Sequence, residues 1–513
     1  MQKTTCRKRN LVYQSSWCQK YHATLFKRFS SYASKCSHYL FLSGYTHQPT
    51  ISKSILSTAL QRTDYEFMET PFSSCSRHHK LLHSNHTISQ KERKSTPLTQ
   101  RPFDRLQCKK QTNQISQMPT LQTILNQLYW IKQRASYSLF PNRILEEIDP
   151  LKETPIPPEA PHIGHIAMYT TGNAGDTLLP LTVRDAFTRE NPINWKGIHA
   201  HRVVNQRVLK TLQEQDGLLI GGGGLFLNDT NPNNLSGWQW SCSLKKLEQI
   251  NRPLAVFAVG YNRFRGQKDF KPIFRDHLQL LAEKSVFIGL RNSGSIQAIK
   301  SYLPAQLHAK VRYQPCPTTL LHTLYSPPPQ LESTQPTIAI NAAFDRLQLR
   351  LGDQYASILE QIALACKQLS QDYKIVYYAH AKSDYQMIPY LERAHVPHSI
   401  VDLFHVPAQT IIKAYQKPSL VIGMRGHAQM IPFGCTTPIL SLISHDKMRW
   451  FLQDIDRPQW GIEMNQPDLT ENLVANATSL LNNHSAIQQD ILNLQDALSK
   501  TTQTNTRDFL KVL

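Results

Sequence analysis

An arginine and a histidine stand two residues apart after an apolar run in the C-terminal half of the chain. Arg425 and His427 follow Leu420–Gly423, which is typical of a buried parallel strand. Ligands of open α/β sheets bind beyond the carboxyl ends of such strands. Arginine offers a permanent charge with forked donors for carboxylate or phosphate, and histidine exchanges a proton near neutral pH. Either residue alone is more often structural, with the arginine pairing to a nearby carboxylate. Together they predict a site for a small anion whose reaction requires a proton.

Three other predicted strands also end in residues suited to ligand contacts. These strand ends are Gly172–Asp176, Gly221–Gly224 and Arg291–Ser295. Glycine allows backbone N–H groups to approach an anion closely. The glycine run matches neither the dinucleotide fingerprint nor a P-loop, so a tight turn beside a crowded core explains it equally well. The first segment is also explained by a turn and a helix cap at Asp176 or Thr177.

Strand and helix signals alternate through most of the chain, which predicts parallel sheets covered by helices. We expect an α/β fold of two Rossmann-like lobes whose parallel sheets face a cleft. A proline-rich break at Ser326–Pro329 separates a lobe at 163–325 from a lobe at 326–465, and a helical tail follows at 466–513. The predicted strands are 163–169, 218–220, 254–259 and 285–290 in the first lobe, and 337–341, 374–378, 420–422 and 439–442 in the second.

The first 117 residues differ in composition from the rest. They carry 19 Lys and Arg against 5 Asp and Glu, and so hold +14 of the formal net charge of +20. They contain five of the nine cysteines, at spacings that match no zinc site, and show no helical or strand period. We interpret residues 1–117 as a basic extension that is disordered or not translated, with Met118 as the true start. A targeting segment, a nucleic-acid-binding tail and a folded domain are the alternatives.

Residues 118–162 are predicted to form an N-terminal helix and a proline-rich linker. The helix is expected to dock on the body of the protein, although Tyr129, Trp130 and nearby basic residues also suit a membrane surface. No run approaches the roughly 20 apolar residues of a membrane span. Cys242, Cys316, Cys366 and Cys435 are scattered, as is typical of reduced thiols in a cytosol. We therefore expect a cytoplasmic protein, with contact at the inner face of the membrane as an option.

In their order along the chain, these motifs resemble the polysaccharide pyruvyl transferase family. The resemblance rests on the Gly-Asn-x-Gly-Asp loop from Gly172, the glycine run, Arg291 with Ser295, and the block Met424–Lys447. It covers roughly residues 163–455, and the last block is its most specific part. One departure is Asn292, where family members often carry an acidic residue. The resemblance implies a two-lobed fold similar to the GT-B type.

The resemblance also implies an activity. Members transfer pyruvate from phosphoenolpyruvate to two hydroxyls of a sugar, which forms a cyclic ketal and releases phosphate. His427 is then the expected acid toward the vinylic carbon, with a pKa raised by the bound anion, and Asp176 a base toward a sugar hydroxyl. The expected donor contacts are Arg291, Arg425, Ser295, Gly426 and Lys447, and the expected acceptor contacts are Asn173, Asp176, Gly222 and Gly223. A solvated role for Lys447 is the stronger alternative. No metal or cofactor is expected beyond phosphoenolpyruvate as co-substrate.

Two other functions compete with this hypothesis. A nucleotide-sugar-dependent glycosyltransferase would use the same scaffold, but no acidic residue suggests itself as the ribose contact of the second lobe. A nucleic-acid-binding protein would explain the positive charge, but most of that charge lies in residues 1–117. We expect a sugar or glycan acceptor, lipid-linked or polymeric, as partner and no nucleic acid. The acceptor sugar, the linkage and the oligomeric state are left open.

Overall fold

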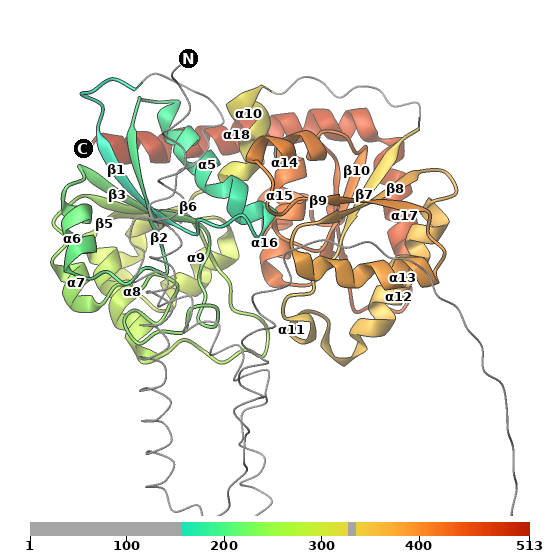
Figure 1. Cartoon of the computed structure of the whole chain (residues 1–513), viewed down its shortest axis with the longest axis horizontal. Helices are drawn as coiled ribbons and strands as arrows, with labels where there is room; N and C mark the ends of the chain where they lie inside the picture. Colours follow the sequence, from blue (N-terminus) through green and yellow to red (C-terminus); the bar gives the residue numbers. More distant parts are fainter. Residues whose placement is uncertain (1–155, 327–334) are drawn as a thin grey trace, which may run out of the picture. The chain divides into compact units, whose positions relative to one another are not determined.

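Two six-stranded sheets, each covered by helices, make up the described part of the chain, which is residues 156–326 and 335–513 of a computed structural model (Figure 1). All strand pairs within both sheets are parallel. Residues 1–117 and nearly all of the predicted helix and linker at 118–162 lie outside the described residues. The α/β class with two parallel-sheet lobes is confirmed.

The first sheet has the strand order β2-β1-β3-β4-β5-β6. Its strands are β1 (His162–Ala167), β2 (Asn194–His199), β3 (Gly217–Phe226), β4 (Leu254–Tyr261), β5 (Ser285–Leu290) and β6 (Val311–Tyr313). Its longer helices are α5 (Ala174–Thr188), α6 (Gln206–Gln213), α8 (Pro272–Lys284) and α9 (Ser293–Lys300), with short helices α7 (Leu244–Glu248) and α10 (Leu321–Tyr325) and the 3-10 turns η2 (Ala305–Lys310) and η3 (Pro317–Leu320).

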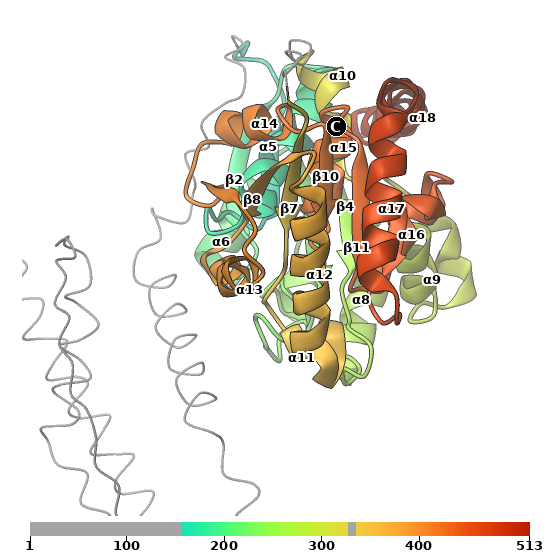
Figure 2. The same ribbon diagram turned by 90° about the vertical axis from the view of Figure 1, so that its right-hand side faces the viewer.

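The second sheet has the order β12-β11-β10-β7-β8-β9. Its strands are β7 (Thr337–Asn341), β8 (Lys374–Ala379), β9 (His398–Asp402), β10 (Leu420–Gly423), β11 (Ile439–Ile443) and β12 (Gly461–Glu463). Its helices are α11 (Leu347–Leu351), α12 (Tyr355–Leu369), α13 (Ile388–Arg393), α14 (Ala408–Tyr415), α15 (His427–Gly434), α16 (Asp446–Asp454), α17 (Leu469–Asn482) and α18 (His484–Leu510). Figure 2 shows α12 and α17 side by side along one face of this sheet.

The glycine run does not end its strand as predicted. β3 continues through all four glycines to Phe226, because the run lies in the crowded centre of the sheet. Gly221 has a φ of +156°, and a Cβ there would lie 1.8 Å from the carbonyl oxygen of Phe257 on β4. Close packing of strand against strand therefore explains this glycine.

The last helix, α18, contacts both lobes and lies along one side of them in Figure 1. Gln495 donates a hydrogen bond to the Phe433 carbonyl of the second lobe at 2.7 Å. Ten residues later, Asn505 donates to the Tyr313 carbonyl of the first lobe at 2.9 Å. The segment predicted as a tail thus joins the two lobes. Within the described residues, no helix has the length and apolar character needed to cross a membrane.

Candidate functional site

A cavity of about 320 Å³ lies between the two lobes. It is lined by the ends of strands and the starts of helices, as expected for parallel sheets. The structure brings seven of the predicted site residues to its wall, from loops that are far apart in the sequence. They are Asn173, Asp176, Arg291, Arg425, Gly426, His427 and Lys447.

Two cations in the cavity wall lack a carboxylate partner. Arg291 follows β5 and is 5% exposed, and Lys447 is the second residue of α16. Among the described residues, no carboxylate lies within 4 Å of either group. Burial, aided by nearby arginines, holds the pKa of Lys447 well below its usual range. Two desolvated and uncompensated cations facing one cavity suit a ligand of high negative charge.

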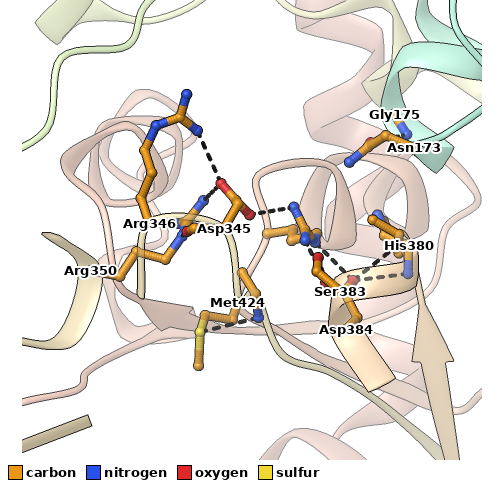
Figure 3. Close-up of polar contacts among 12 residues, drawn as sticks. Asn173, Gly175, Asp345, Arg346, Arg350, His380, Ser383, Asp384 and Met424 are labelled. Carbon is orange, nitrogen blue, oxygen red and sulfur yellow. Dashed lines mark hydrogen bonds and ion pairs between the residues drawn. The ribbon is translucent and has the colours of Figure 1, made fainter. Parts of the chain in front are cut away.

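Arg425, by contrast, is held by two carboxylates, Asp345 and Asp384, both of which are labelled in Figure 3. Its Nε donates to Asp384 at 2.9 Å, its Nη2 also contacts Asp384, and its Nη1 donates to Asp345 at 2.7 Å. Burial alone would lower the pKa of Arg425, but these two carboxylates outweigh it and raise the pKa. Arg425 is therefore paired with carboxylates, which is the alternative that the sequence left open for it.

Asp345 connects Arg425 to two further arginines in the cavity wall. Arg350 donates to its carboxylate at 2.9 Å, and Arg346 does so at 3.3 Å while also pairing with Asp229 of the first lobe at 2.7 Å. Arg350, Arg346 and Asp345 are labelled in Figure 3. The three arginines of this cluster are thus matched by three carboxylates: Arg346, Arg350 and Arg425 by Asp229, Asp345 and Asp384. This cluster is balanced in charge, unlike Arg291 and Lys447.

His427, the first residue of α15, lies between Gly175 of the first lobe and Cys316. Its Nε2 is 3.8 Å from the Cys316 Sγ. A Cβ at position 175 would lie only 1.9 Å from its Nδ1, so the imidazole can take this position only beside a glycine. Burial, then Arg291 and Lys447, lower the pKa of His427 to about 3. The pKa rise expected for this histidine concerns the anion-bound state; in the free protein the imidazole is neutral at neutral pH.

Asp176 lines the cavity from the first turn of α5. Burial raises its pKa from 3.8 to about 6, and the positive charges of Arg425, Lys447 and Arg291 limit the rise. A carboxyl with this pKa can accept or donate a proton near neutral pH. It does not cap the helix, because Asn173 does so by accepting from the Gly175 N–H at 2.9 Å.

Three predicted site residues do not line the cavity. Ser295 is buried, and its Oγ accepts from the Tyr261 N–H at 2.9 Å. Gly222 and Gly223 pack in β3 against Leu179 of α5, where a Cβ at position 222 would come within 3.0 Å of that side chain. Asn292, the departure from the family pattern, caps α9 by accepting from the Ser295 N–H at 2.8 Å. Asparagine therefore supplies the cap that an acidic residue would supply.

The cavity also contains residues that sequence reasoning missed. They follow β3, β4, β7 and β8, which the sequence predicted. Polar residues directly after these strands could therefore have been proposed as site residues. His380 comes directly after β8; its Nε2 contacts the Tyr415 hydroxyl and its buried Nδ1 has no partner. The missed lining residues that bear polar or charged side chains are Thr230, Gln239, Asn262, Asp345, Arg346, Arg350, His380 and Ser383.

No group of three or more His, Cys, Asp or Glu side chains is arranged to hold a metal ion in the part of the chain that the structure describes. The cavity wall is instead dominated by cations and hydrogen-bonding groups.

Known proteins are similar to this chain in sequence or in fold. A family model described as polysaccharide pyruvyl transferase matches residues 120–446. No curated protein matches the sequence. Similar solved structures include sucrose-phosphate synthase (tll1590) from Thermosynechococcus elongatus, with 10% identity, coverage of 69% of this chain and 98% of that chain, and a TM-score of 0.44. Another is Anabaena Alr3699/HepE in complex with UDP and glucose, with 11% identity, coverage of 69% and 100%, and a TM-score of 0.43. A third is UDP-GlcNAc 2-epimerase from Neisseria meningitidis bound to UDP-GlcNAc, with 12% identity, coverage of 68% and 100%, and a TM-score of 0.42.

Proposed function

Because the chain belongs to the polysaccharide pyruvyl transferase family, we propose that it moves a pyruvyl group from phosphoenolpyruvate to two hydroxyls of a sugar. The product is a cyclic ketal, and inorganic phosphate is released. The acceptor is a sugar of a surface polysaccharide or of its precursor. The reaction takes place in the cytoplasm, and the protein needs no metal or cofactor.

The observation that carries this proposal is the pair of uncompensated cations beside a histidine. Arg291 and Lys447 face the same cavity as His427 and have no carboxylate partner among the described residues. Phosphoenolpyruvate carries a carboxylate and a phosphate, so it supplies the negative charge that this pair lacks. Arg425 also lines the cavity, where its charge attracts the donor. Its ion pairs with Asp345 and Asp384 fix the position of the neighbouring Gly426, which is another donor contact.

The first chemical step is the addition of a proton to the methylene carbon of the donor. The imidazolium of His427 gives this proton, and the neighbouring carbon becomes electrophilic. Burial, and after it the charges of Arg291 and Lys447, lower the pKa of His427 in the free protein. A bound anion offsets these two charges, so its arrival raises the pKa of the imidazole and favours the protonated acid.

The sugar then attacks the electrophilic carbon twice. The first hydroxyl forms a C–O bond, and its proton passes to the Asp176 carboxylate. The C–O bond to phosphate breaks, the proton held by Asp176 leaves with the phosphate, and the second hydroxyl closes the ketal ring while returning its proton to His427. Asn173, one turn from Asp176, binds the acceptor. Each proton is accounted for, and the carboxyl pKa of about 6 suits this exchange.

The decisive experiment mixes the full-length protein with phosphoenolpyruvate and a panel of galactoside, glucoside and N-acetylmannosamine glycans. Mass spectrometry should detect the gain of a pyruvyl ketal on one of them, together with release of phosphate. Nucleotide sugars serve as the competing donors. Glycosyl transfer from a nucleotide sugar, with no reaction of phosphoenolpyruvate, would assign the chain to the glycosyltransferase alternative.

A further inference from the structure

The ammonium group of Lys447 has an unusual partner for a buried cation. Its Nζ donates to the side-chain carbonyl of Asn262, which directly follows β4 in the first lobe, at 2.8 Å. Both residues line the cavity. A neutral carbonyl oxygen directs the ammonium but leaves its charge available to a ligand, whereas a carboxylate would neutralise it.

The glycine run explains how Asn262 reaches this position. A Cβ at Gly224 would lie 2.8 Å from the Nδ2 and 3.1 Å from the Cγ of Asn262. Glycine at position 224 therefore makes room for the asparagine. Gly224 thus has a role of its own: it was not among the predicted acceptor contacts, and the close packing of β3 on β4 at Gly221 does not explain it.

The loop that begins with Asn262 contacts three consecutive residues of the second lobe. In addition to the Lys447 contact, Arg265 pairs with Asp446, and the Phe264 ring lies 4.2 Å from the His445 ring between centroids. Residues 262–267, which we term the β4–α8 loop, thus hold the whole segment 445–447 at the start of α16.

The β4–α8 loop has its own internal order. The Gln267 side chain accepts from the Phe264 N–H at 3.0 Å, and its backbone carbonyl accepts from the Arg263 Nε at 2.9 Å. The Gln267 amide also donates to Asp229 at 3.0 Å, the carboxylate that pairs with Arg346 across the cleft. The loop is therefore a formed turn tied to a second contact between the lobes.

We infer that Asn262 is the positioning residue of the donor-binding lysine, and that the β4–α8 loop holds segment 445–447 so that the ammonium faces the bound anion. The identity of the anion as phosphoenolpyruvate rests on the proposed function. If Asn262 had only a structural role, a negative charge at position 262 would not specifically weaken donor binding. A positioning role predicts that it does.

The test compares Asn262→Asp with Asn262→Ala in the full-length protein. Aspartate keeps the shape of asparagine but neutralises Lys447 and repels the donor, so the KM for phosphoenolpyruvate should rise by about 10- to 100-fold, the scale of a lost charge-assisted contact. Alanine removes only the orienting carbonyl and should raise this KM by about 3- to 10-fold. The KM for the acceptor should not change in either variant. Asn251→Asp makes the same charge change at an exposed position before the other end of β4, and its KM should stay within about twofold of the wild type.

A second measurement separates this inference from the proposed function. Phosphoenolpyruvate should raise the melting temperature of the wild type by mass action, and the rise should be lost in Asn262→Asp. A wild type that phosphoenolpyruvate does not stabilise overturns the proposed function. A stabilised wild type with equally stabilised Asn262 variants overturns the inference, as does an equal loss in Asn251→Asp. Should the Asn262 variants not fold, Arg265→Ala decides: a raised donor KM supports the role of the loop, and an unchanged one overturns it.

Discussion

Arg291 and Arg425 bring the same chemical group into the same cavity, but their surroundings predict different effects of mutation. Arg291 has no carboxylate partner among the described residues, so Arg291→Ala should weaken phosphoenolpyruvate binding by about 1.5–3 kcal/mol with little loss of stability. Arg425→Ala leaves the fully buried Asp384 without its ion-pair partner and should cost about 3–5 kcal/mol of unfolding free energy. Donor titration and thermal unfolding of both variants measure these effects. Equal losses of stability in the two would contradict the distinction.

His427 is the residue on which the proposed chemistry depends. His427→Gln should still bind phosphoenolpyruvate through Arg291 and Lys447 but lose turnover by roughly 10²–10⁴-fold, the scale of general acid catalysis. With the wild type in deuterated water, deuterium should enter the methyl group of the ketal. The turnover rate of the enzyme with bound phosphoenolpyruvate should fall as the pH rises through the pKa that the imidazole has in this complex. Near-normal turnover of the glutamine variant would move the acid to Asp176.

Asp176 makes a prediction about stability and pH. Its folded-state pKa of about 6 exceeds the ordinary value of 3.8, so the folded protein binds this proton more tightly than the unfolded chain does. The ionised carboxylate therefore costs stability, fully above about pH 6 and not at all below the unfolded pKa. Asp176→Asn should raise the unfolding free energy by up to about 3 kcal/mol near pH 8 and change it little near pH 4, while activity falls. Chemical denaturation at both pH values tests this; a gain that is the same at both would exclude the titration.

At the scale of elements, the sequence predicted the inner strands of both sheets and missed the edges. The eight predicted strands are the four central strands of each sheet, whose apolar runs are continuous because both faces are covered. The four missed strands, β2, β6, β9 and β12, are the edge strands. β9, His398–Asp402, contains only half-buried and exposed residues, so it has no buried apolar run to detect.

The same reasoning explains which site residues were predicted. Arg291, Arg425 and His427 follow predicted strands and have side chains with obvious chemistry. His380 follows a predicted strand equally closely, but it is one of 21 histidines and its contact with Tyr415 is tertiary. Whether an arginine at a strand end binds a ligand or a carboxylate also depends on residues 80 and 41 positions away, as Arg425 shows.

The first turn of α5 should be sensitive to one methyl group. A Cβ at position 175 would lie 1.9 Å from the His427 Nδ1, so Gly175→Ala must displace the imidazole. Because the side chain can move and alanine suits a helix, the unfolding free energy should change by less than about 1 kcal/mol. Turnover should fall toward that of His427→Gln. Full activity of Gly175→Ala would show that the imidazole position in the free protein is not the one used in catalysis.

At the scale of the molecule, alternation of strands and helices is sufficient to predict two lobes, but not how they meet. The lobes contact each other at points set by tertiary packing, such as the Ala174 N–H, which donates to the His380 carbonyl at 3.2 Å. That contact places the start of α5 beside the end of β8, and with it Asp176 in the wall of the same cavity as Lys447. Nothing in the local sequence of either segment specifies this pairing.

The chain end offers a test of how the lobes depend on each other. Phe509 is fully buried near the end of α18 and packs edge-on against Phe187 of the first lobe, with ring centroids 6.0 Å apart. Phe509→Ala should cost about 3–5 kcal/mol, the usual range for a buried aromatic side chain. Because the earlier part of α18 is anchored in the second lobe through Gln495, the loss should fall on the first lobe. Calorimetry should then resolve two transitions, with the first lobe melting at the lower temperature. Phosphoenolpyruvate should merge the two transitions into one, because the donor site uses residues of both lobes. A single transition that shifts by less than the equivalent of about 1 kcal/mol would show that α18 does not support the first lobe.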